Sequence, residues 1–454
     1  MINPEAAVRV QEASSGPALA RKLGLFDAVM LVMGGIIGSG IFINSYVVAR
    51  QVHTPALILG AWAMGGLIAL LGAFIYAELA TRQPEVGGQY AYLRDAYHPA
   101  VAFLYGWVLL LVIQTGGMAA VSITFAKYFL EATQLPVSDS VIAIVTLLIL
   151  TLINCLGVRA GSTFQSFLMV LKIAAIIAVV SCGIALIHIP YLTTATAATN
   201  SNSTSLIPAF GAAMAPVMFA FGGWQTATFI SGELKDPRRD LARGLVVGII
   251  GVILLYLAMN IVYVGALGSE GLAQTTTPAS TLMRQAFGNW GAILIALVIS
   301  ISTLGFLSQG MLTAPRVYFA MAKDGLFFNR VAWVHPRSRV PVVAIAMQGI
   351  LAAIIAVSGR YESILNYVVS VDFIAFGLTA TCIFIFRRRQ QLEPTSGSGI
   401  FRTPGHPITT ILFIVACWLV VISTVYQYPR NTILGLLILI AGMPVYLFWS
   451  RRKN

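Results

Sequence analysis

Residues 34–42 read Gly-Gly-Ile-Ile-Gly-Ser-Gly-Ile-Phe, in the middle of a charge-free run, 28–49, that is long enough to cross a bilayer. Glycine weakens a helix and adds no apolar surface, so this density of glycine predicts an interruption of the helix. Residues 219–224, Phe-Ala-Phe-Gly-Gly-Trp, repeat the pattern in a later apolar segment. Unwound backbone at membrane depth is tolerated only where protein buries it or where it lines a cavity. Two interrupted helices at corresponding places in two halves of a chain therefore indicate a binding site between them.

The composition assigns the chain to the membrane. The 454 residues are 58% apolar and only 10% charged, against roughly 25% charged in soluble domains. Because a helix needs about 20 apolar residues to span the hydrocarbon, we expect about twelve transmembrane helices in an all-α polytopic membrane protein. The expected centres lie near Ile37, Leu67, Leu110, Val145, Ile177, Phe221, Leu255, Ser302, Met347, Ile374, Val415 and Ile438.

The distribution of charge predicts the topology. The net charge is +12, and 21 of the 28 lysines and arginines fall in short segments on one side of the predicted spans. Cytoplasmic loops carry such an excess, so we expect both termini in the cytoplasm of a protein in the cell membrane. No basic aromatic groove accompanies the charge, which argues against nucleic acid as a partner. Residues 1–24 do not resemble a cleaved signal peptide and are expected to form a cytoplasmic tail.

The sequence gives little support to a metal-binding protein, an enzyme or a channel. The four cysteines lie inside predicted spans, and the five histidines lie at span ends without ligand spacing. We therefore expect no metal, no cofactor and no enzymatic activity. A channel would need a continuous polar pore, and the predicted spans contain none.

The two interruptions have complementary chemistry. We expect one half-helix over 26–37, extended backbone around 38–40 and a second half-helix from near Ile41. The N–H groups and positive dipole end of that second half-helix favour a carboxylate. Residues 221–223 free carbonyl oxygens at the end of a half-helix, which favour an ammonium. Together these sites describe an α-amino acid, while the alternative is that the glycines only allow close helix packing.

Longer motifs support this interpretation. They are Ile-Ile-Gly-Ser-Gly-Ile-Phe at 36–42, the segments 76–107, 219–224 and 232–241, Thr-Ala-Pro-Arg at 313–316 and Ala-Lys-Asp-Gly at 322–325. With these motifs the chain resembles the amino acid–polyamine–organocation superfamily, and within it the L-type amino acid transporter branch. The resemblance implies a LeuT-like five-plus-five inverted repeat in which helices 1 and 6 are broken. The implied division is a tail over 1–24, a first repeat over 25–188, an outer loop over 189–208, a second repeat over 209–389, and the last two helices with the C-terminus over 390–454.

The resemblance also assigns a substrate site. A group of four residues in the first interruption is expected to hold the substrate carboxylate through its backbone. A group of three residues in the second interruption is expected to hold the substrate ammonium in the same way. Phe219 is expected to close over the substrate as an aromatic lid, with Trp224 as a second gating aromatic, while the alternative for Phe219 is simple packing. Gln225 stands where this branch often has asparagine or aspartate and is expected to contact the substrate. The carboxylate group is Ile37, Gly38, Ser39 and Gly40, and the ammonium group is Phe219, Ala220 and Gly222.

Lys172 lies among apolar residues inside a predicted span. It resembles the lysine of helix 5 that takes the place of a sodium ion between helices 1 and 8 in sodium-independent branches. The expected partners are the carbonyls of Gly34 and Gly35 and a hydroxyl of Ser302 or Thr303. The alternative is that Lys172 snorkels to the membrane surface.

The remaining charges refine the expected function. Asp372, inside the tenth predicted helix, either couples protons or braces the bundle. Glu78, Arg82 and Glu233 are interpreted as solvated charges at cytoplasmic helix ends in preference to an inner gate. Because the second interruption contains no acid, we expect a secondary active transporter of neutral L-amino acids that works without sodium and by exchange.

Alternatives within the superfamily are a proton-coupled symporter, a carrier of cationic amino acids or polyamines, and a sensor that binds without transport. Animal members of the branch attach to a heavy chain by a disulfide at the outer loop. The loop 131–138 has no cysteine, so no disulfide-linked heavy chain is expected. The oligomeric state stays open.

Overall fold

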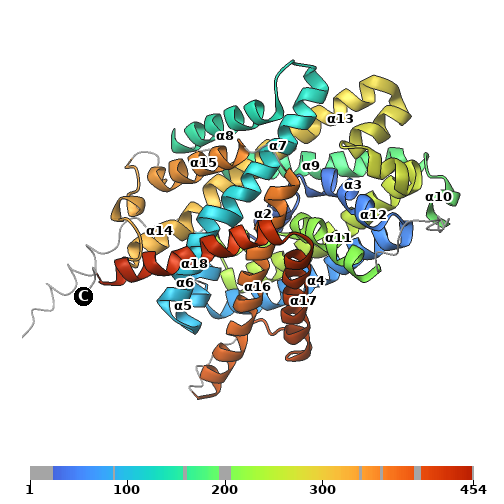
Figure 1. Ribbon diagram of the computed structural model, residues 1–454. Helices are drawn as coiled ribbons and strands as arrows, with labels where there is room; N and C mark the ends of the chain where they lie inside the picture. The colour runs from blue at the N-terminus through green and yellow to red at the C-terminus, as the bar shows by residue number, and fades with distance from the viewer. Residues whose placement is uncertain are drawn as a thin grey trace, which may run out of the picture.

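The computed structural model describes residues 24–84, 87–156, 161–193, 206–336, 340–357, 361–392 and 400–451. Within these ranges the chain is helical and has no strand (Figure 1). The first half comprises α2 Leu25–Ile36, α3 Gly40–Val52, α4 Pro55–Arg82, α5 Gln89–Ala96, α6 Pro99–Val108, the π-helical turn η1 Leu109–Ile113, α7 Gln114–Thr133, α8 Asp139–Leu156, α9 Gly161–Ile184 and α10 Ile189–Thr193. The second half comprises α11 Leu206–Phe221, the 3-10 helix η2 Trp224–Glu233, η3 Pro237–Leu241, α12 Ala242–Gln274, α13 Pro278–Thr313, α14 Pro315–Lys323, η4 Asn329–Ala332, α15 Val342–Ala356, α16 Tyr361–Leu392, α17 Ile408–Gln427 and α18 Pro429–Arg451.

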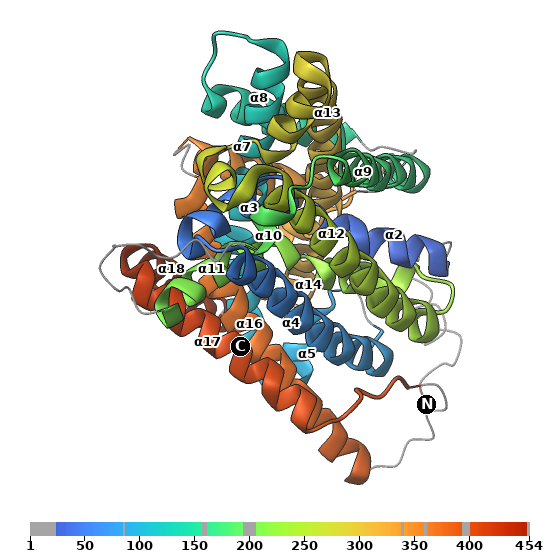
Figure 2. The ribbon, with the colours of Figure 1, turned by 90° about the vertical axis from the view of Figure 1, so that its right-hand side faces the viewer.

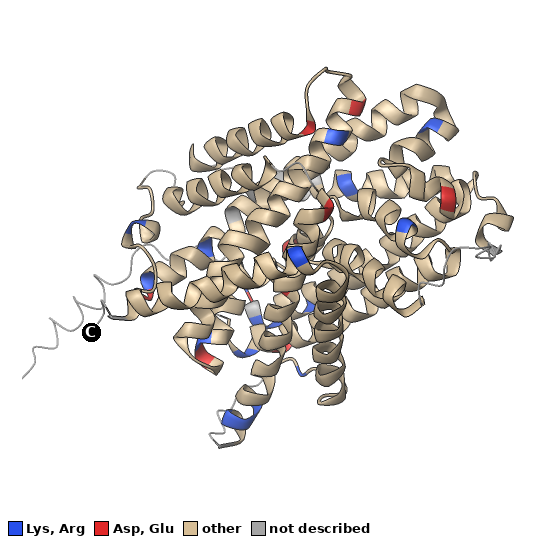
Figure 3. Ribbon diagram, viewed as in Figure 1, with Lys and Arg blue, Asp and Glu red and all other residues tan. Residues whose placement is uncertain are grey.

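The helices have the length and composition of membrane spans. Ten are long and apolar enough to cross a bilayer, and two shorter apolar helices, Met169–Ile184 and Val342–Ala356, accompany them in the described residues. Each of the twelve expected centres lies inside one of these segments. Long stretches of the ribbon carry no charge (Figure 3). An all-α polytopic membrane protein is confirmed, and the count of twelve crossings stays a prediction.

Two helix pairs form the centre of the bundle. The half-helices α2 and α3 are successive parts of one interrupted span, and α11 and η2 are successive parts of another. The halves pack crosswise, because α3 contacts α11 while α2 contacts η2. Helix α12 packs along α4 and also contacts α2 and α3, as Figure 2 shows from the side. Helices α17 and α18 lie at the periphery with many exposed apolar side chains, as expected for a surface that faces lipid.

The segment 189–208, expected as an outer loop, contains the short helix α10, and α11 already begins at Leu206. Residues 194–205 and the expected tail, except for Gly24, lie outside the described residues.

Glu78 is not a solvated charge, so its interpretation from sequence was wrong. Its side chain is fully buried. The carboxylate accepts hydrogen bonds from the guanidinium groups of Arg82 (2.7 Å) and Arg387 (2.7 Å) and from the backbone N–H of Thr403 (2.7 Å). A buried carboxylate needs such partners, which only the folded chain brings together. Glu78 thus joins α4, α16 and the segment before α17; the side chain of Glu233 lies outside the described residues.

Candidate functional site

The first interruption lies where the glycines predict it. Helix α2 ends at Ile36, and Ile37 leaves the helical conformation with φ −73° and ψ 82°. The N–H groups of Ile37 and Gly38 donate to Met33 (2.7 Å) and Ile36 (2.8 Å). Helix α3 then begins at Gly40, one residue earlier than expected. The first N–H groups of a helix have no acceptor within it. The N–H of Phe42 donates to the carbonyl of Ser39 (3.0 Å), which leaves the N–H groups of Gly40 and Ile41 for a ligand.

The second interruption is equally sharp. Helix α11 ends at Phe221, and Gly223 has φ +106°, a conformation that glycine adopts without strain. The N–H of Gly222 donates to the carbonyl of Phe219 (3.3 Å), and the N–H of Gly223 donates to Oε1 of Gln225 (3.0 Å). The 3-10 helix then starts at Trp224. The last carbonyl groups of α11 consequently have no partner within their own helix.

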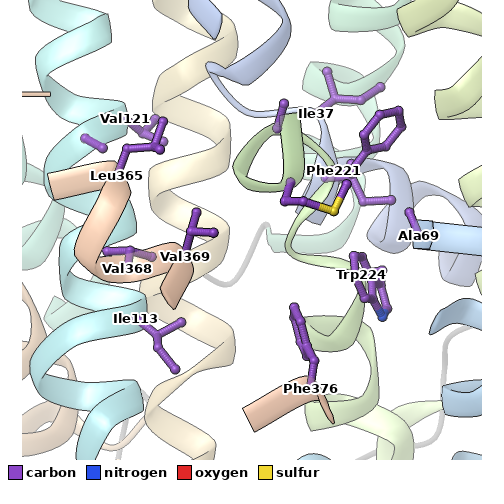
Figure 4. Close-up of a cluster of buried hydrophobic side chains, with 14 of the residues drawn as sticks. Ile37, Ala69, Ile113, Val121, Phe221, Trp224, Leu365, Val368, Val369 and Phe376 are labelled. Carbon is purple, nitrogen blue, oxygen red and sulfur yellow. The ribbon is translucent and has the colours of Figure 1, made fainter. Parts of the chain in front are cut away.

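The two interruptions touch each other. A methyl group on Gly35 would lie 2.7 Å from the carbonyl oxygen of Gly223, and one on Gly40 would lie 2.6 Å from Cα of Ala220. Both distances are too short for a real side chain, so glycine permits the crossing. Figure 4 labels Ile37 and Phe221, one from each interruption, within one cluster of buried hydrophobic side chains.

Tyr256 of α12 joins the two interruptions, and the sequence interpretation missed it. Its buried hydroxyl lies 3.2 Å from the carbonyl oxygen of Ile36 and 3.3 Å from that of Ala220. These carbonyls belong to the ends of α2 and α11. A tyrosine in an apolar span has the same sequence signature whether it packs or donates, so no local signal identified it.

One cavity opens at the crossing. The first interruption, the second interruption and α16 all contribute to its lining, and its walls include apolar side chains of η1, α7 and α16 such as Ile113, Val121, Val368 and Val369 (Figure 4). The predicted site residues that line it are Gly35, Gly38, Ser39, Gly40, Phe219, Gly222, Gln225 and Asp372. Those that do not line it are Ile37, Ala220, Trp224, Lys172, Gly34, Ser302 and Thr303.

The two predicted gating aromatics have different surroundings. Phe219 lines the cavity, and its ring meets that of Tyr361 edge to face at 6.2 Å. Trp224 is buried and stacks on Phe376 with ring centroids 4.8 Å apart. It also meets Tyr76 edge to face at 6.4 Å. Phe219 is therefore placed to contact a ligand directly, whereas Trp224 belongs to the packed aromatic cluster beside the cavity.

Lys172 is buried inside the bundle and does not snorkel. Its side chain is 2% exposed, and its ammonium donates a hydrogen bond of 2.6 Å to the carbonyl oxygen of Ile37. Helix α9, which carries Lys172, packs against α2 and α13. The lysine thus stabilises the carbonyl that the first interruption removes from the α2 hydrogen-bond ladder.

The partners expected for Lys172 are not the observed ones. Among the described residues, no hydrogen bond joins it to Gly34, Gly35, Ser302 or Thr303. Gly34 faces Gln309 and Gly35 faces Gly223, while the Thr303 hydroxyl donates within its own helix to Ile299 (3.1 Å). The carbonyl of Ile37 is the acceptor because the interruption begins at that residue.

Asp372 faces the cavity from α16. It is half-buried, and its Oδ1 atom is inaccessible to solvent and has no hydrogen-bond partner. In the parts of the chain that the structure describes, no ion pair involves Asp372, and no other lining residue is charged.

Comparisons with known proteins identify the family. A family model described as amino acid permease matches residues 23–448. A serine/threonine exchanger of Bacillus subtilis is 30% identical over 96% of this chain and 98% of its own. The mouse large neutral amino acids transporter small subunit 2 is 29% identical over 98% of this chain and 85% of its own, and the mouse Asc-type amino acid transporter 1 is 26% identical over 97% and 84%. The resemblance to the amino acid–polyamine–organocation superfamily and its L-type branch is confirmed, and the chain belongs to the amino acid permease family of membrane transporters.

Proposed function

We propose that this permease moves neutral L-amino acids across the cell membrane by alternating access, without sodium and by exchange. The observation that carries the proposal is the contact of two helix interruptions at one cavity. This contact supports the N–H groups at the start of α3 and the carbonyl groups at the end of α11 as the two ligand sites. A zwitterion presents one anionic and one cationic group at a fixed spacing, which matches this pair of backbone sites.

The contacts refine the assignment of the backbone groups. The first-turn N–H groups after Gly38 receive the carboxylate. Phe219 and Gly222 line the cavity, and their carbonyls receive the ammonium, since the Phe219 carbonyl, which accepts one N–H bond from Gly222, keeps a second lone pair. We assign no ligand contact to the carbonyls of Ile37 and Ala220, because neither residue lines the cavity and because Lys172 and Tyr256 bond to these carbonyls.

A neutral substrate fits the lining. Beside the apolar wall the cavity presents neutral amides and hydroxyls, among them Gln114, Gln225 and Thr226. Two relatives are named for serine and threonine exchange and for large neutral amino acids. The second candidate is a cationic amino acid, which Asp372 favours as a counter-charge in the same cavity.

Lys172 supports operation without sodium. Its ammonium is a fixed cation bound to the first interruption, where a sodium ion would otherwise supply charge. The crosswise packing of α2 on η2 and of α3 on α11 supports a five-plus-five inverted repeat. In such a repeat one half rocks against the other around the fixed site.

We also propose that the chain acts without a disulfide-linked heavy chain. The loop between α7 and α8 has no cysteine. All four cysteines of the chain are buried or half-buried free thiols in helices. Both termini are proposed to face the cytoplasm, from the excess of basic residues on that side.

Purified protein in liposomes tests this function. Vesicles that contain an unlabelled neutral amino acid are compared with empty vesicles for uptake of labelled threonine, leucine and arginine, with and without sodium. Uptake of threonine or leucine only into loaded vesicles, equal in both salts, supports the proposal. Selective uptake of arginine supports the second candidate, and a strict sodium requirement contradicts the role of Lys172.

A further inference from the structure

We propose that Asp372 is a proton-binding group whose protonation is coupled to the closure of the cavity around a neutral amino acid. The inference rests on the proposed function, because it concerns the same cavity. It adds a second ligand, the proton, at a site distinct from the backbone groups that hold the zwitterion.

The position of Asp372 is the first observation. It lies on α16 one turn before Phe376, whose ring stacks on Trp224 directly after the second interruption. Asp372 lines the cavity together with Gly222 and Gln225. A ligand held between the two interruptions therefore shares its cavity with this carboxyl group.

The second observation is a set of buried polar atoms without hydrogen-bond partners. Besides Oδ1 of Asp372, the hydroxyl of Tyr105 is buried and has no hydrogen-bond partner among the described residues, and it interacts electrostatically with the carboxyl group. Buried polar atoms are rarely left unpaired, so this group requires an explanation. A protonated carboxyl supplies one, because its O–H can donate to a tyrosine oxygen.

No cation balances the carboxylate within the described residues. Helix α16 packs against α4, α5, α7, α11, α17, α18 and η1. The titratable neighbours that interact with Asp372 are Tyr76 on α4, Tyr105 on α6 and Cys417 on α17, and none is cationic.

Other charges on these elements have partners elsewhere: Glu78 pairs with Arg82 and Arg387, Arg94 pairs with Asp95 and Asp324, and Glu131 pairs with Arg284. Helix α11 and the turn η1 carry no titratable side chain. Lys127 lies near the C-terminal end of α7, and Arg430 lies in the first turn of α18.

These observations lead to a thermodynamic coupling. In a hydrated open cavity an ionised Asp372 is solvated by water. Closure removes that water, and an unpaired carboxylate in a dry cavity costs several kcal/mol. A zwitterion has no net charge and, held by the backbone groups, brings no counter-charge to Asp372. Closure around it therefore favours the protonated carboxyl, and by linkage a higher proton concentration favours substrate binding.

The test measures protons directly. Purified protein in weakly buffered detergent is mixed with L-threonine or L-leucine between about pH 5 and pH 8 while an indicator dye reports proton uptake, and binding is measured in parallel by equilibrium dialysis. Wild-type protein is expected to take up as much as one proton per bound amino acid within this range. Asp372→Asn is expected to bind the amino acid without proton uptake. Glu270→Gln, which changes an exposed carboxylate near the end of α12, is the matched control and behaves as wild type.

Each outcome decides the inference. Binding to wild-type protein with no proton uptake across the pH range overturns it, even where Asp372→Asn does not fold. Uptake that persists in Asp372→Asn but disappears in Lys172→Met assigns the proton to the lysine and overturns it as well. Absence of any amino acid binding to wild-type protein instead contradicts the proposed function, so the two failures are distinguishable.

Discussion

The ammonium of Lys172 lies 2.6 Å from the carbonyl oxygen of Ile37, the residue at which the first membrane helix stops. A cation buried at this depth is stable only with such a partner, and the carbonyl is free only because the helix is interrupted. The two features therefore depend on each other. The lysine fixes the backbone directly before Gly38, Ser39 and Gly40, which line the cavity.

Replacement of Lys172 by methionine tests this dependence. The variant keeps an unbranched side chain that is one heavy atom shorter and removes the hydrogen bond to Ile37. A hydrogen bond from a charged group is worth about 1.5–3 kcal/mol, so substrate affinity is expected to fall by roughly tenfold to a hundredfold. Lys127→Met alters a lysine near the end of α7 and serves as the control. Equal exchange rates for wild type and Lys172→Met in liposomes would show that the lysine has no role in transport.

Tyr256→Phe removes the hydroxyl that lies between the ends of α2 and α11. The loss of one hydrogen bond costs about 1 kcal/mol, and we expect a drop of about fivefold in substrate affinity. Tyr263→Phe on the same helix is the matched control, because the Tyr263 hydroxyl is buried but has no partner among the described residues. Substrate-induced thermal stabilisation reports both affinities. The same loss in both variants would mean that the bridge between the interruptions is unimportant.

Gly40→Ala places a methyl group against the backbone of Ala220, 2.6 Å from its Cα. Because backbone cannot move aside as a flexible side chain does, α3 and α11 must separate. We expect a lower melting temperature and loss of substrate binding. Gly60→Ala, where the new methyl group meets nothing within 4 Å, is expected to melt at or above the temperature of the wild type. Unimpaired binding by Gly40→Ala would refute the close crossing of the two helices.

Glu78→Gln tests the buried ionic cluster at the ends of α4 and α16. The variant leaves Arg82 and Arg387 without their shared carboxylate, and removal of one partner from a buried pair costs about 3–5 kcal/mol. Glu362→Gln changes an exposed pair with Arg50 and is expected to cost at most about 1 kcal/mol. Thermal denaturation followed by size-exclusion chromatography compares the two. Similar melting temperatures for both variants would argue that the Glu78 cluster does not stabilise the fold.

The sequence predicted those features that depend on local composition. The interruptions at 37–39 and 222–223 followed from glycine in apolar runs, and the burial of Lys172 followed from its apolar neighbours. Features that depend on the rotation of one helix against another were not predictable. The acceptor of Lys172, the bridge by Tyr256 and the buried cluster of Glu78 all join residues more than 100 positions apart in the chain.

The most direct test of the central claim is a structure determined with bound L-threonine. We expect its carboxylate to accept hydrogen bonds from the N–H groups of Ser39, Gly40 and Ile41, and its ammonium to donate to the carbonyls of Phe219 and Gly222. An amino acid bound away from both interruptions, or held only by side chains, would contradict it.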